Sequence, residues 1–363
     1  MATYLDYNAT APVRPQVAER MAELLGVPHN ASSVHGFGRA AKKILEDSRR
    51  TIAEAIGVFP REIIFTATGS EANATALQGF PGRRVLVSAV EHSSVSATIK
   101  KDGIIPVLSS GVLNLEALEE ALAEGQQSLV SIQLANNETG VIQPISDIAK
   151  ICKKYGALLH SDAVQALGKI PVDFGLLGAD MLTLSAHKMG GPVGAACLVV
   201  RQDVAVQPLI RGGGQELGFR AGTENIPAIT GFAKAVELID LAHMRQVEGW
   251  MRGMESELES KTDHKLAIAS TTPRLPNTSC IAMQGVANEV QLMDFDLKGF
   301  AVSAGSACSS GRVEASHVLT AMGLGPLAKN AIRISAGWNT QEKEIISFTD
   351  TWIQTYKRLA TNS

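Results

Sequence analysis

The sequence has little that points to a membrane, to nucleic acid or to a secretory route. No uninterrupted apolar run approaches the roughly 20 residues that a membrane helix needs, and the first residues lack the basic and apolar regions of a signal peptide. The formal net charge is only −3, so electrostatics does not favour nucleic acid or an anionic membrane as partner. We therefore expect a soluble, cytoplasmic protein that binds a small ligand.

Cysteine is also scarce. The four cysteines include no C-x-x-C pair and are too few for a disulfide scaffold, so we expect reduced thiols. Cys152, Cys197 and Cys280 have apolar neighbours and are expected to be buried. Cys308 differs, because residues 303–312 are small and form little core, so this segment is expected to expose its thiol.

The pattern of apolar residues indicates an α/β protein. Hydrophobic residues make up 45% of the 363 positions, enough for one large core and a smaller second one. Short apolar runs alternate with amphipathic helical stretches. The predicted strands span residues 63–66, 85–88, 129–134, 158–161, 181–184 and 196–200. The predicted helices span residues 15–25, 38–56, 71–78, 114–123 and 146–155.

The pattern changes in the last third of the chain. After Thr223 one long helical pattern continues to about Glu259. Short strands then resume, at residues 279–283, 301–303 and 332–335. This change predicts a small C-terminal domain.

Two of the predicted strands turn polar where they end. Asp162 follows strand 158–161, and Ser185, His187 and Lys188 follow strand 181–184. Neighbouring strands that end this way deliver their side chains to one crevice. An amine, a carboxylate and phosphate donors are the groups that pyridoxal phosphate requires, so a Schiff base at Lys188 is predicted. The alternative is a solvated loop lysine and a turn residue at Asp162.

A glycine turn and a histidine follow two further strands. Gly69 and Ser70 lie between strand 63–66 and a helix whose first N–H groups form an anion site. The alternative is an ordinary turn, capped by Thr68 or Ser70. His92 lies beyond strand 85–88, where it could stack on a cofactor ring or exchange protons, although a lone histidine is usually structural.

Amide and glycine residues suggest further contacts. Asn136 and Asn137 follow strand 129–134 and offer amides to a ring hydroxyl or a substrate carboxylate, the alternative being a turn before Gly140. Residues 211–225 are rich in glycine and polar groups, which suits close approach to a ligand or a subunit. A mobile surface loop explains that stretch almost as well.

Taken together, these motifs resemble one family, the cysteine desulfurases of the nitrogen-fixation and iron–sulfur-assembly type. They are class V aminotransferases within the fold-type I pyridoxal phosphate enzymes. The resemblance covers nearly the whole chain and rests on residues 4–12, 30–35, 69–71, 91–92, 136–140, 162–165, 185–188, 220–223, 305–308 and 331–335. It implies a large cofactor domain (15–250) with a mixed, mostly parallel seven-stranded sheet flanked by helices. It also implies a small α+β domain (1–14 and 251–363) that carries the catalytic cysteine loop.

The resemblance implies a role for each cofactor-site residue. Lys188 would form the Schiff base and then act as the base, Asp162 would pair with the pyridinium nitrogen, Gln165 would bond the ring hydroxyl, and His92 would stack on the ring. The phosphate would be held by Gly69, Ser70, Ser185 and His187, with Thr223 donated by the other subunit of a homodimer. No metal is implied.

The resemblance also implies the substrate and its fate. Asn137, which would also contact the cofactor, and Arg333 would hold the carboxylate of L-cysteine, and Cys308 would accept the sulfur as a persulfide, leaving L-alanine. The partner would be a sulfur acceptor or an iron–sulfur scaffold protein. Only thirty residues follow Arg333, fewer than in members that dock a scaffold. Ala31 and Trp338 stand where relatives often carry proline and arginine.

Three other functions are compatible with parts of this pattern. A selenocysteine lyase or another pyridoxal phosphate-dependent C–S lyase would use the same cofactor but would not need Cys308. A class V aminotransferase acting on serine or phosphoserine would share Lys188 and Asp162. A scaffold or binding protein that kept only the fold would be expected to have lost the lysine, the carboxylate or Arg333, and all three are present.

Overall fold

The structure is a computed structural model that describes residues 2–97, 99, 101–262, 267–305 and 315–360. Its largest element is a seven-stranded sheet in the order β2-β8-β7-β6-β5-β3-β4. Strand β8 is antiparallel to both of its neighbours, and all the other pairs are parallel. The strands are β2 (Ile63–Thr66), β3 (Arg84–Ser88), β4 (Ile104–Ile105), β5 (Ser128–Ser131), β6 (Leu158–Asp162), β7 (Met181–Ser185) and β8 (Ala196–Val200). The mixed, mostly parallel sheet confirms the predicted fold class.

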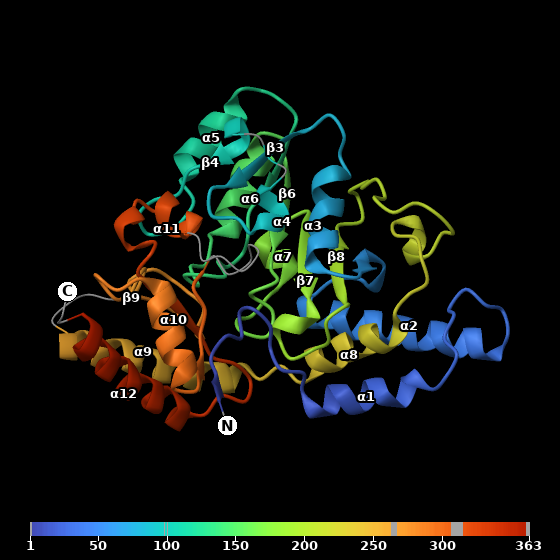
Figure 1. The fold of residues 1–363 in the computed structure, drawn as a ribbon. Helices are drawn as coiled ribbons and strands as arrows, with labels where there is room; N and C mark the ends of the chain where they lie inside the picture. Colours follow the sequence, from blue (N-terminus) through green and yellow to red (C-terminus); the bar gives the residue numbers. More distant parts are fainter. Residues whose placement is uncertain (1, 98, 100, 263–266, 306–314, 361–363) are drawn as a thin grey trace.

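Helices cover both faces of this sheet (Figure 1). Because both faces are covered, every residue of β5, β7 and β8 is buried. One face packs against α1 (Pro15–Leu25), α2 (Gly36–Ile56), α5 (Leu115–Ala123), α6 (Ile145–Lys154), α7 (Phe174–Leu177) and α8 (Ile226–Glu237). The other face packs against α3 (Gly69–Gln78) and α4 (Ser93–Ser96). Ile63 and Phe65 of β2 belong to the first core and Ile64 to the second, as strand alternation requires.

A separate core lies in the C-terminal part. Strand β9 (Thr278–Ala282) pairs antiparallel with β11 (Ala331–Ser335), and β1 (Thr3–Tyr4) pairs parallel with β10 (Phe300–Ala301). The surrounding helices are α9 (Leu241–Thr262), α10 (Asn288–Leu297), α11 (His317–Ala321) and α12 (Glu342–Leu359). Leu5 from the N-terminal segment packs in this core, as do Met244 and Val247. The predicted domain boundaries stay a prediction.

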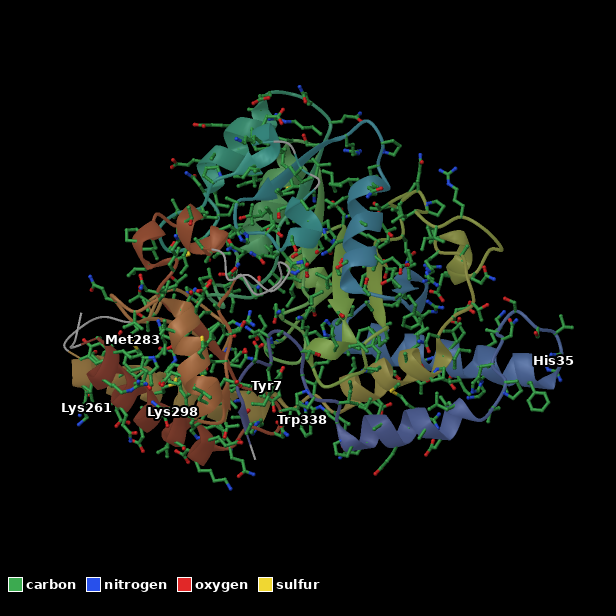
Figure 2. All side chains as sticks on the ribbon, in the orientation of Figure 1. Tyr7, His35, Lys261, Met283, Lys298 and Trp338 are labelled. Atoms are coloured by element: carbon green, nitrogen blue, oxygen red, sulfur yellow. The ribbon has the colours of Figure 1, made fainter. Side chains whose placement is uncertain are left out.

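The N-terminal segment connects the two regions. Figure 2 places Tyr7 and Trp338 close together near the junction. The Trp338 indole N–H donates to the Pro12 carbonyl oxygen at 2.9 Å, and the Arg14 guanidinium lies 5.0 Å from the centre of the Trp338 ring. A side chain at Gly337 would collide with the Tyr7 ring, so glycine is required there. Trp338 thus holds residues 12–14 against the segment that follows β11.

The structure differs from the sequence prediction in several places, including the unpredicted helices α10 and α12. The single long helix predicted from Thr223 to about Glu259 is wrong, because α8 ends at Glu237 and α9 begins at Leu241. The Asp240 carboxylate accepts hydrogen bonds from the Ala242 and His243 N–H groups, at 2.9 and 3.0 Å, and so starts a new helix. Strands β1 and β4 were missed because two residues are too short to show a period. Within the described ranges no helix is long and apolar enough to cross a membrane.

Candidate active site

A pocket of about 370 Å³ lies at the carboxyl ends of the central strands. Ten of the predicted site residues line it: Gly69, Ser70, His92, Asn137, Asp162, Gln165, Ser185, His187, Lys188 and Arg333. Two do not join them. Thr223 is exposed and lies outside the pocket lining, and Cys308 lies outside the described residues. The lining also includes Ser303 and Gly305, which precede the segment that contains Cys308.

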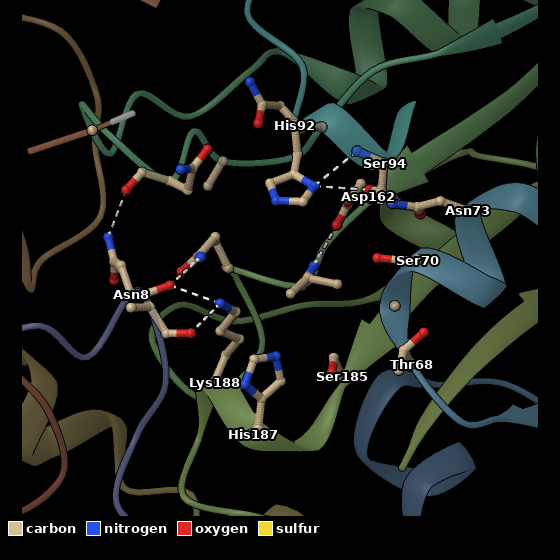
Figure 3. Close-up of a pocket in the computed structure, with 18 of the residues that line it drawn as sticks. Asn8, Thr68, Ser70, Asn73, His92, Ser94, Asp162, Ser185, His187 and Lys188 are labelled. Atoms are coloured by element: carbon tan, nitrogen blue, oxygen red, sulfur yellow. Dashed lines mark hydrogen bonds between the residues drawn. The ribbon is translucent and has the colours of Figure 1, made fainter. Parts of the chain in front are cut away.

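Lys188 is placed by a single turn after β7. The 3-10 turn Ala186–Lys188 follows directly on the strand and brings the lysine side chain into the pocket (Figure 3). Its Nζ donates to the carbonyl oxygens of Asn8 and Ala9, at 2.8 and 2.6 Å. The N-terminal segment therefore passes beside the reactive amine and holds it with two neutral acceptors.

Asp162 ends the neighbouring strand β6 and is held rigidly. Its Oδ2 accepts from the Asn73 amide at 2.8 Å, and its Oδ1 accepts from the Val164 N–H at 2.9 Å. The residue is only 9% exposed. Asn73 comes from helix α3 and was missed, since nothing in the sequence around residue 73 reveals a partner 89 positions away. The result is a fixed carboxylate that faces the pocket.

The first turn of α3 lies at the other end of the pocket and has the geometry of an anion site. Thr68 caps this helix, its Oγ1 accepting from the Glu71 N–H at 3.0 Å. The N–H groups of the first turn have no partner inside the helix and point outward. A Cβ at Gly69 would lie 3.1 Å from a Val164 methyl group, so the backbone closely approaches the segment that follows β6. Figure 3 shows Ser70 and Ser185 beside this turn, which gives hydroxyl donors around it.

Two histidines in the pocket are held in the neutral form. Burial, with help from Lys188 and Lys169, lowers the pKa of His187 to about 4. Burial also lowers the pKa of His92. The His92 Nδ1 accepts from the Ser94 N–H at 3.1 Å, which places the ring proton on Nε2. His92 therefore presents an uncharged ring, as a stacking partner for an aromatic ligand requires.

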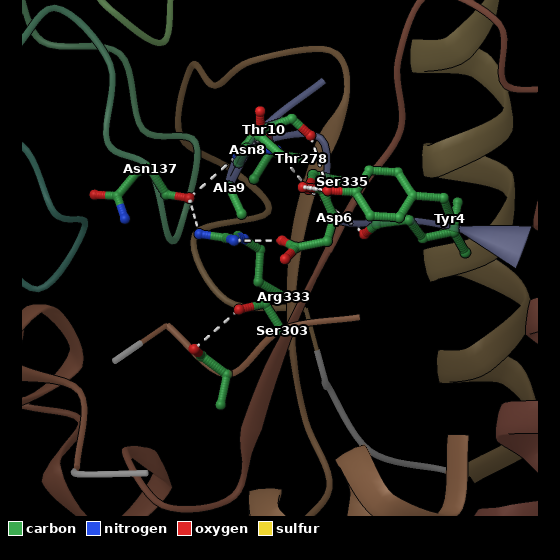
Figure 4. Close-up of polar contacts among 12 residues, drawn as sticks. Tyr4, Asp6, Asn8, Ala9, Thr10, Asn137, Thr278, Ser303, Arg333 and Ser335 are labelled. Atoms are coloured by element: carbon green, nitrogen blue, oxygen red, sulfur yellow. Dashed lines mark hydrogen bonds and ion pairs between the residues drawn. The ribbon is translucent and has the colours of Figure 1, made fainter. Parts of the chain in front are cut away.

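Arg333 reaches the pocket from β11 of the C-terminal region (Figure 4). Its Nη2 pairs with Asp6 Oδ1 at 2.5 Å, and its Nη1 donates to the Asn137 carbonyl oxygen at 3.0 Å. The Nε group is buried and has no hydrogen-bond partner among the described residues. A buried guanidinium with a donor left over is suited to bind a carboxylate.

Asn8 connects these groups and was not singled out in the sequence. Its backbone oxygen accepts from Lys188 Nζ and from Gln165 Nε2. Its side-chain amide donates to the Asn137 carbonyl oxygen at 3.1 Å and to Thr278 Oγ1 at 2.9 Å. Its only sequence signal was membership of the 4–12 motif. The N-terminal segment thus joins the sheet side of the pocket to the C-terminal region.

The chain was compared with known proteins. The family model "Aminotransferase class-V" matches residues 3–348. The chain is 38% identical to the cysteine desulfurase IscS of Dictyoglomus turgidum, over 99% of this chain and 96% of that protein. It is 41% identical to a cysteine desulfurase of Cereibacter sphaeroides, over 94% and 92% of the two chains.

Solved structures agree with this result. A NifS-like protein from Rickettsia africae superposes with a TM-score of 0.90 and 37% identity, over 98% of this chain and all of that chain. Its match includes both the sheet and the C-terminal region, since nearly every residue is covered. The chain therefore belongs to the class-V aminotransferases and, within them, to the family of the cysteine desulfurases.

Proposed function

We propose that this protein is a pyridoxal phosphate-dependent cysteine desulfurase, which converts L-cysteine to L-alanine and takes up the sulfur as a persulfide on Cys308. One observation carries the proposal. Lys188, Asp162 and the first turn of α3 line a single pocket, so an amine, a fixed carboxylate and an anion site stand together.

The residues of the pocket fit pyridoxal phosphate in their chemistry. Lys188 would hold the aldehyde as a Schiff base, and Asp162, fixed by Asn73 and Val164, would hold the proton of the ring nitrogen. The neutral ring of His92 would stack on the cofactor, and the second N–H of Gln165 Nε2 would bind its ring oxygen. The phosphate would lie at the α3 turn, with donors from Gly69, Ser70, Ser185 and His187.

Different residues of the chain carry out proton transfer and substrate binding. When bound, pyridoxal phosphate withdraws electrons from the Cα–H bond of the attached amino acid. Lys188 takes the Cα proton, and the Asn8 and Ala9 carbonyls give its amine a defined resting position. Arg333 and Asn137 bind the substrate carboxylate, for which the buried Arg333 Nε supplies a donor.

Sulfur transfer requires a nucleophilic thiol. The Cys308 thiolate attacks the substrate sulfur, so that a S–S bond forms, the C–S bond of the substrate breaks, and the three-carbon product is protonated and leaves as alanine. The other cysteines are unsuitable, because Cys152, Cys197 and Cys280 are buried. Burial raises the pKa of Cys152 and of Cys280 to about 12, so both stay protonated.

The proposed setting follows from this chemistry. We place the enzyme in the cytoplasm, where thiols are kept reduced. We further propose a homodimer, in which the exposed Thr223 of one subunit completes the phosphate site of the other. The persulfide would pass to a sulfur-acceptor or iron–sulfur scaffold protein.

The test uses the purified protein loaded with pyridoxal phosphate and given L-cysteine. We expect alanine in the solution and one added sulfur on the peptide that carries Cys308, read by mass spectrometry. The Cys308→Ser variant should keep the cofactor yet form almost no alanine. Full alanine production by Cys308→Ser would instead indicate a direct C–S lyase. Amino transfer to a keto acid in place of sulfur release would indicate an aminotransferase.

A further inference from the structure

Lys169 is a second lysine beside the pocket, and the proposed chemistry does not use it. It is 5% exposed, and no carboxylate of the described chain pairs with it. Its Nζ donates instead to two neutral amide oxygens, Gln165 Oε1 at 2.6 Å and Asn8 Oδ1 at 2.7 Å. A buried lysine without a counter-ion is costly. We therefore expect Lys169 to have a function that offsets this cost, such as orienting the side chains around it.

The hydrogen bonds of Gln165 with Asn8 and with Lys169 together fix which way its amide points. The Gln165 nitrogen lies 2.9 Å from the Asn8 backbone oxygen, which can only accept, so that end must be Nε2. The other end must be the oxygen, which accepts from Lys169. The Asn8 amide is fixed by the same logic, because its nitrogen faces the Asn137 carbonyl oxygen. Lys169 therefore supplies one N–H to each of the two amide oxygens and is the second of the contacts that orient each amide.

The Gln165 nitrogen also lies beside the reactive amine. Lys188 Nζ and Gln165 Nε2 both donate to the same Asn8 oxygen, at 2.8 and 2.9 Å. In pyridoxal phosphate the ring hydroxyl is attached next to the carbon that carries the aldehyde. A group that binds this hydroxyl oxygen must therefore lie close to the amine that binds the aldehyde. The second N–H of Gln165 Nε2 meets this requirement.

The surroundings of Lys169 change its pKa but not its ability to donate to both amide oxygens. Burial first, and then the nearby charges of Lys188 and Arg333, lower the pKa of Lys169 far below its usual value. The amine needs two N–H donors for its contacts, one for each oxygen, and it has them whether or not it carries a third proton.

We propose that Lys169 is a positioning residue that locks the Gln165 amide with its nitrogen toward the cofactor's ring oxygen, so that Gln165 acts as a donor there. This inference rests on the proposed pyridoxal phosphate site. A donor at this position favours the ionised ring oxygen, and with it a proton on Lys188 Nζ in the Schiff base. Without Lys169 only the Asn8 carbonyl oxygen holds the amide in this orientation, so the amide presents its oxygen to the cofactor more often and the preference weakens.

The test is the absorption spectrum of the loaded protein, which separates the ionised ring oxygen (long-wavelength band) from the neutral one (short-wavelength band). In Lys169→Met we expect the ratio of the two bands to shift toward the short-wavelength band by about fivefold, since one net hydrogen bond is worth on the order of 1 kcal/mol. The matched control is Lys150→Met, at a lysine whose side chain is 76% exposed, and its spectrum should equal the parent's.

Further variants separate positioning from mere structural support. In a Gln165→Ala background, Lys169→Met should change the band ratio no further, because Lys169 acts through Gln165. Gln165→Glu keeps Lys169 but lacks the side-chain N–H, so it should show the same shift toward the short-wavelength band. This variant takes the place of Lys169→Met if the latter does not fold. An unchanged ratio in either Lys169→Met or Gln165→Glu would overturn the inference. If borohydride fixes no cofactor on Lys188 of the parent protein, the proposed function itself is wrong.

Discussion

The two sides of the pocket are built in different ways. On the sheet side, Asp162, Ser185 and Lys188 are delivered by neighbouring strands, and their positions follow from the sheet alone. On the other side, Arg333 meets Asp6 across 327 residues of sequence. That side exists only when the N-terminal segment lies between the two cores. The sheet side is therefore expected to make most of the contacts to the cofactor, whereas the substrate side depends more fully on contacts between distant parts of the chain.

The sharpest test of the sheet side is Lys188→Ala. We expect turnover of L-cysteine to fall by about 10³-fold or more, because the variant loses both the Schiff base and the general base. The protein should remain folded, since Lys188 lies in a turn after β7 and its hydrogen bonds to the Asn8 and Ala9 carbonyls join it to a loop and not to a core. Alanine formation and thermal unfolding are measured together, with Lys150→Ala as the control. Near-normal turnover would show that another amine forms the Schiff base and takes the Cα proton.

A smaller loss is expected for Asp162→Asn. The amide keeps the shape of the carboxylate and can still accept from Val164, but it cannot hold the ring-nitrogen proton by charge. We expect kcat to fall by about 10²-fold with little change in KM, because the lost interaction is electrostatic and grows in the transition state. Steady-state kinetics with L-cysteine measures both constants. If KM rises while kcat stays constant, Asp162 contributes to binding instead.

The opposite pattern is expected on the substrate side. Arg333→Ala removes the carboxylate donor and also leaves Asp6 without its partner. We expect the KM for L-cysteine to rise by about 10- to 100-fold, the range for hydrogen bonds to a charged group, while cofactor binding is unchanged. Arg333→Lys keeps the charge but not the fork of donors and should fall between parent and alanine variant. Weaker cofactor binding would contradict the division into two sides.

This division also explains what the sequence could and could not predict. Asp162, Ser185 and Lys188 each follow a buried apolar run, and that local pattern suffices to place them at one sheet edge. Asn73, Asn8 and Asp6 could not be found in this way, because their roles depend on partners 89, 180 and 327 positions away. The break at Asp240 was missed for a related reason. A single capping carboxylate interrupts an apolar period that continues on both sides of it.

Gly305→Ala tests how the segment containing Cys308 begins. A Cβ at Gly305 would lie 1.9 Å from Glu138 Oε2, and the same carboxylate oxygen accepts from Ser316 Oγ at 2.6 Å. Glu138 thus contacts both residue 305 and residue 316, on either side of Cys308. We expect the variant to form the Cys308 persulfide about tenfold more slowly, with the cofactor spectrum unchanged, because a clash with a buried group shifts the backbone. Gly325→Ala, where a Cβ meets nothing within 4 Å, is the control. Equal rates in the two variants would show that the contact is unimportant.

The smallest effect is expected on stability, at His160 in strand β6, two residues before Asp162. Its ring lies between Ser131 Oγ at 2.8 Å and Thr183 Oγ1 at 2.9 Å, and burial lowers its pKa from 6.5 to about 4. The unfolded chain therefore binds a proton between about pH 6.5 and about pH 4 that the folded chain does not. Stability from the neutral ring is complete above that window and is lost as the pH falls through it.

His160→Gln can keep both hydrogen bonds and does not titrate. The free energy of unfolding, measured with urea across this window, should then fall less steeply, by about 1.4 kcal/mol per pH unit for the one proton removed. His187, whose pKa is also lowered to about 4, acts with the same sign, so part of the acid sensitivity should remain. His29→Gln, outside the pocket lining, is the control. If His160→Gln and the parent lose stability with the same slope, the buried ring is not neutral in the folded protein, and acid sensitivity of the sheet side must come from His187 or the carboxylates.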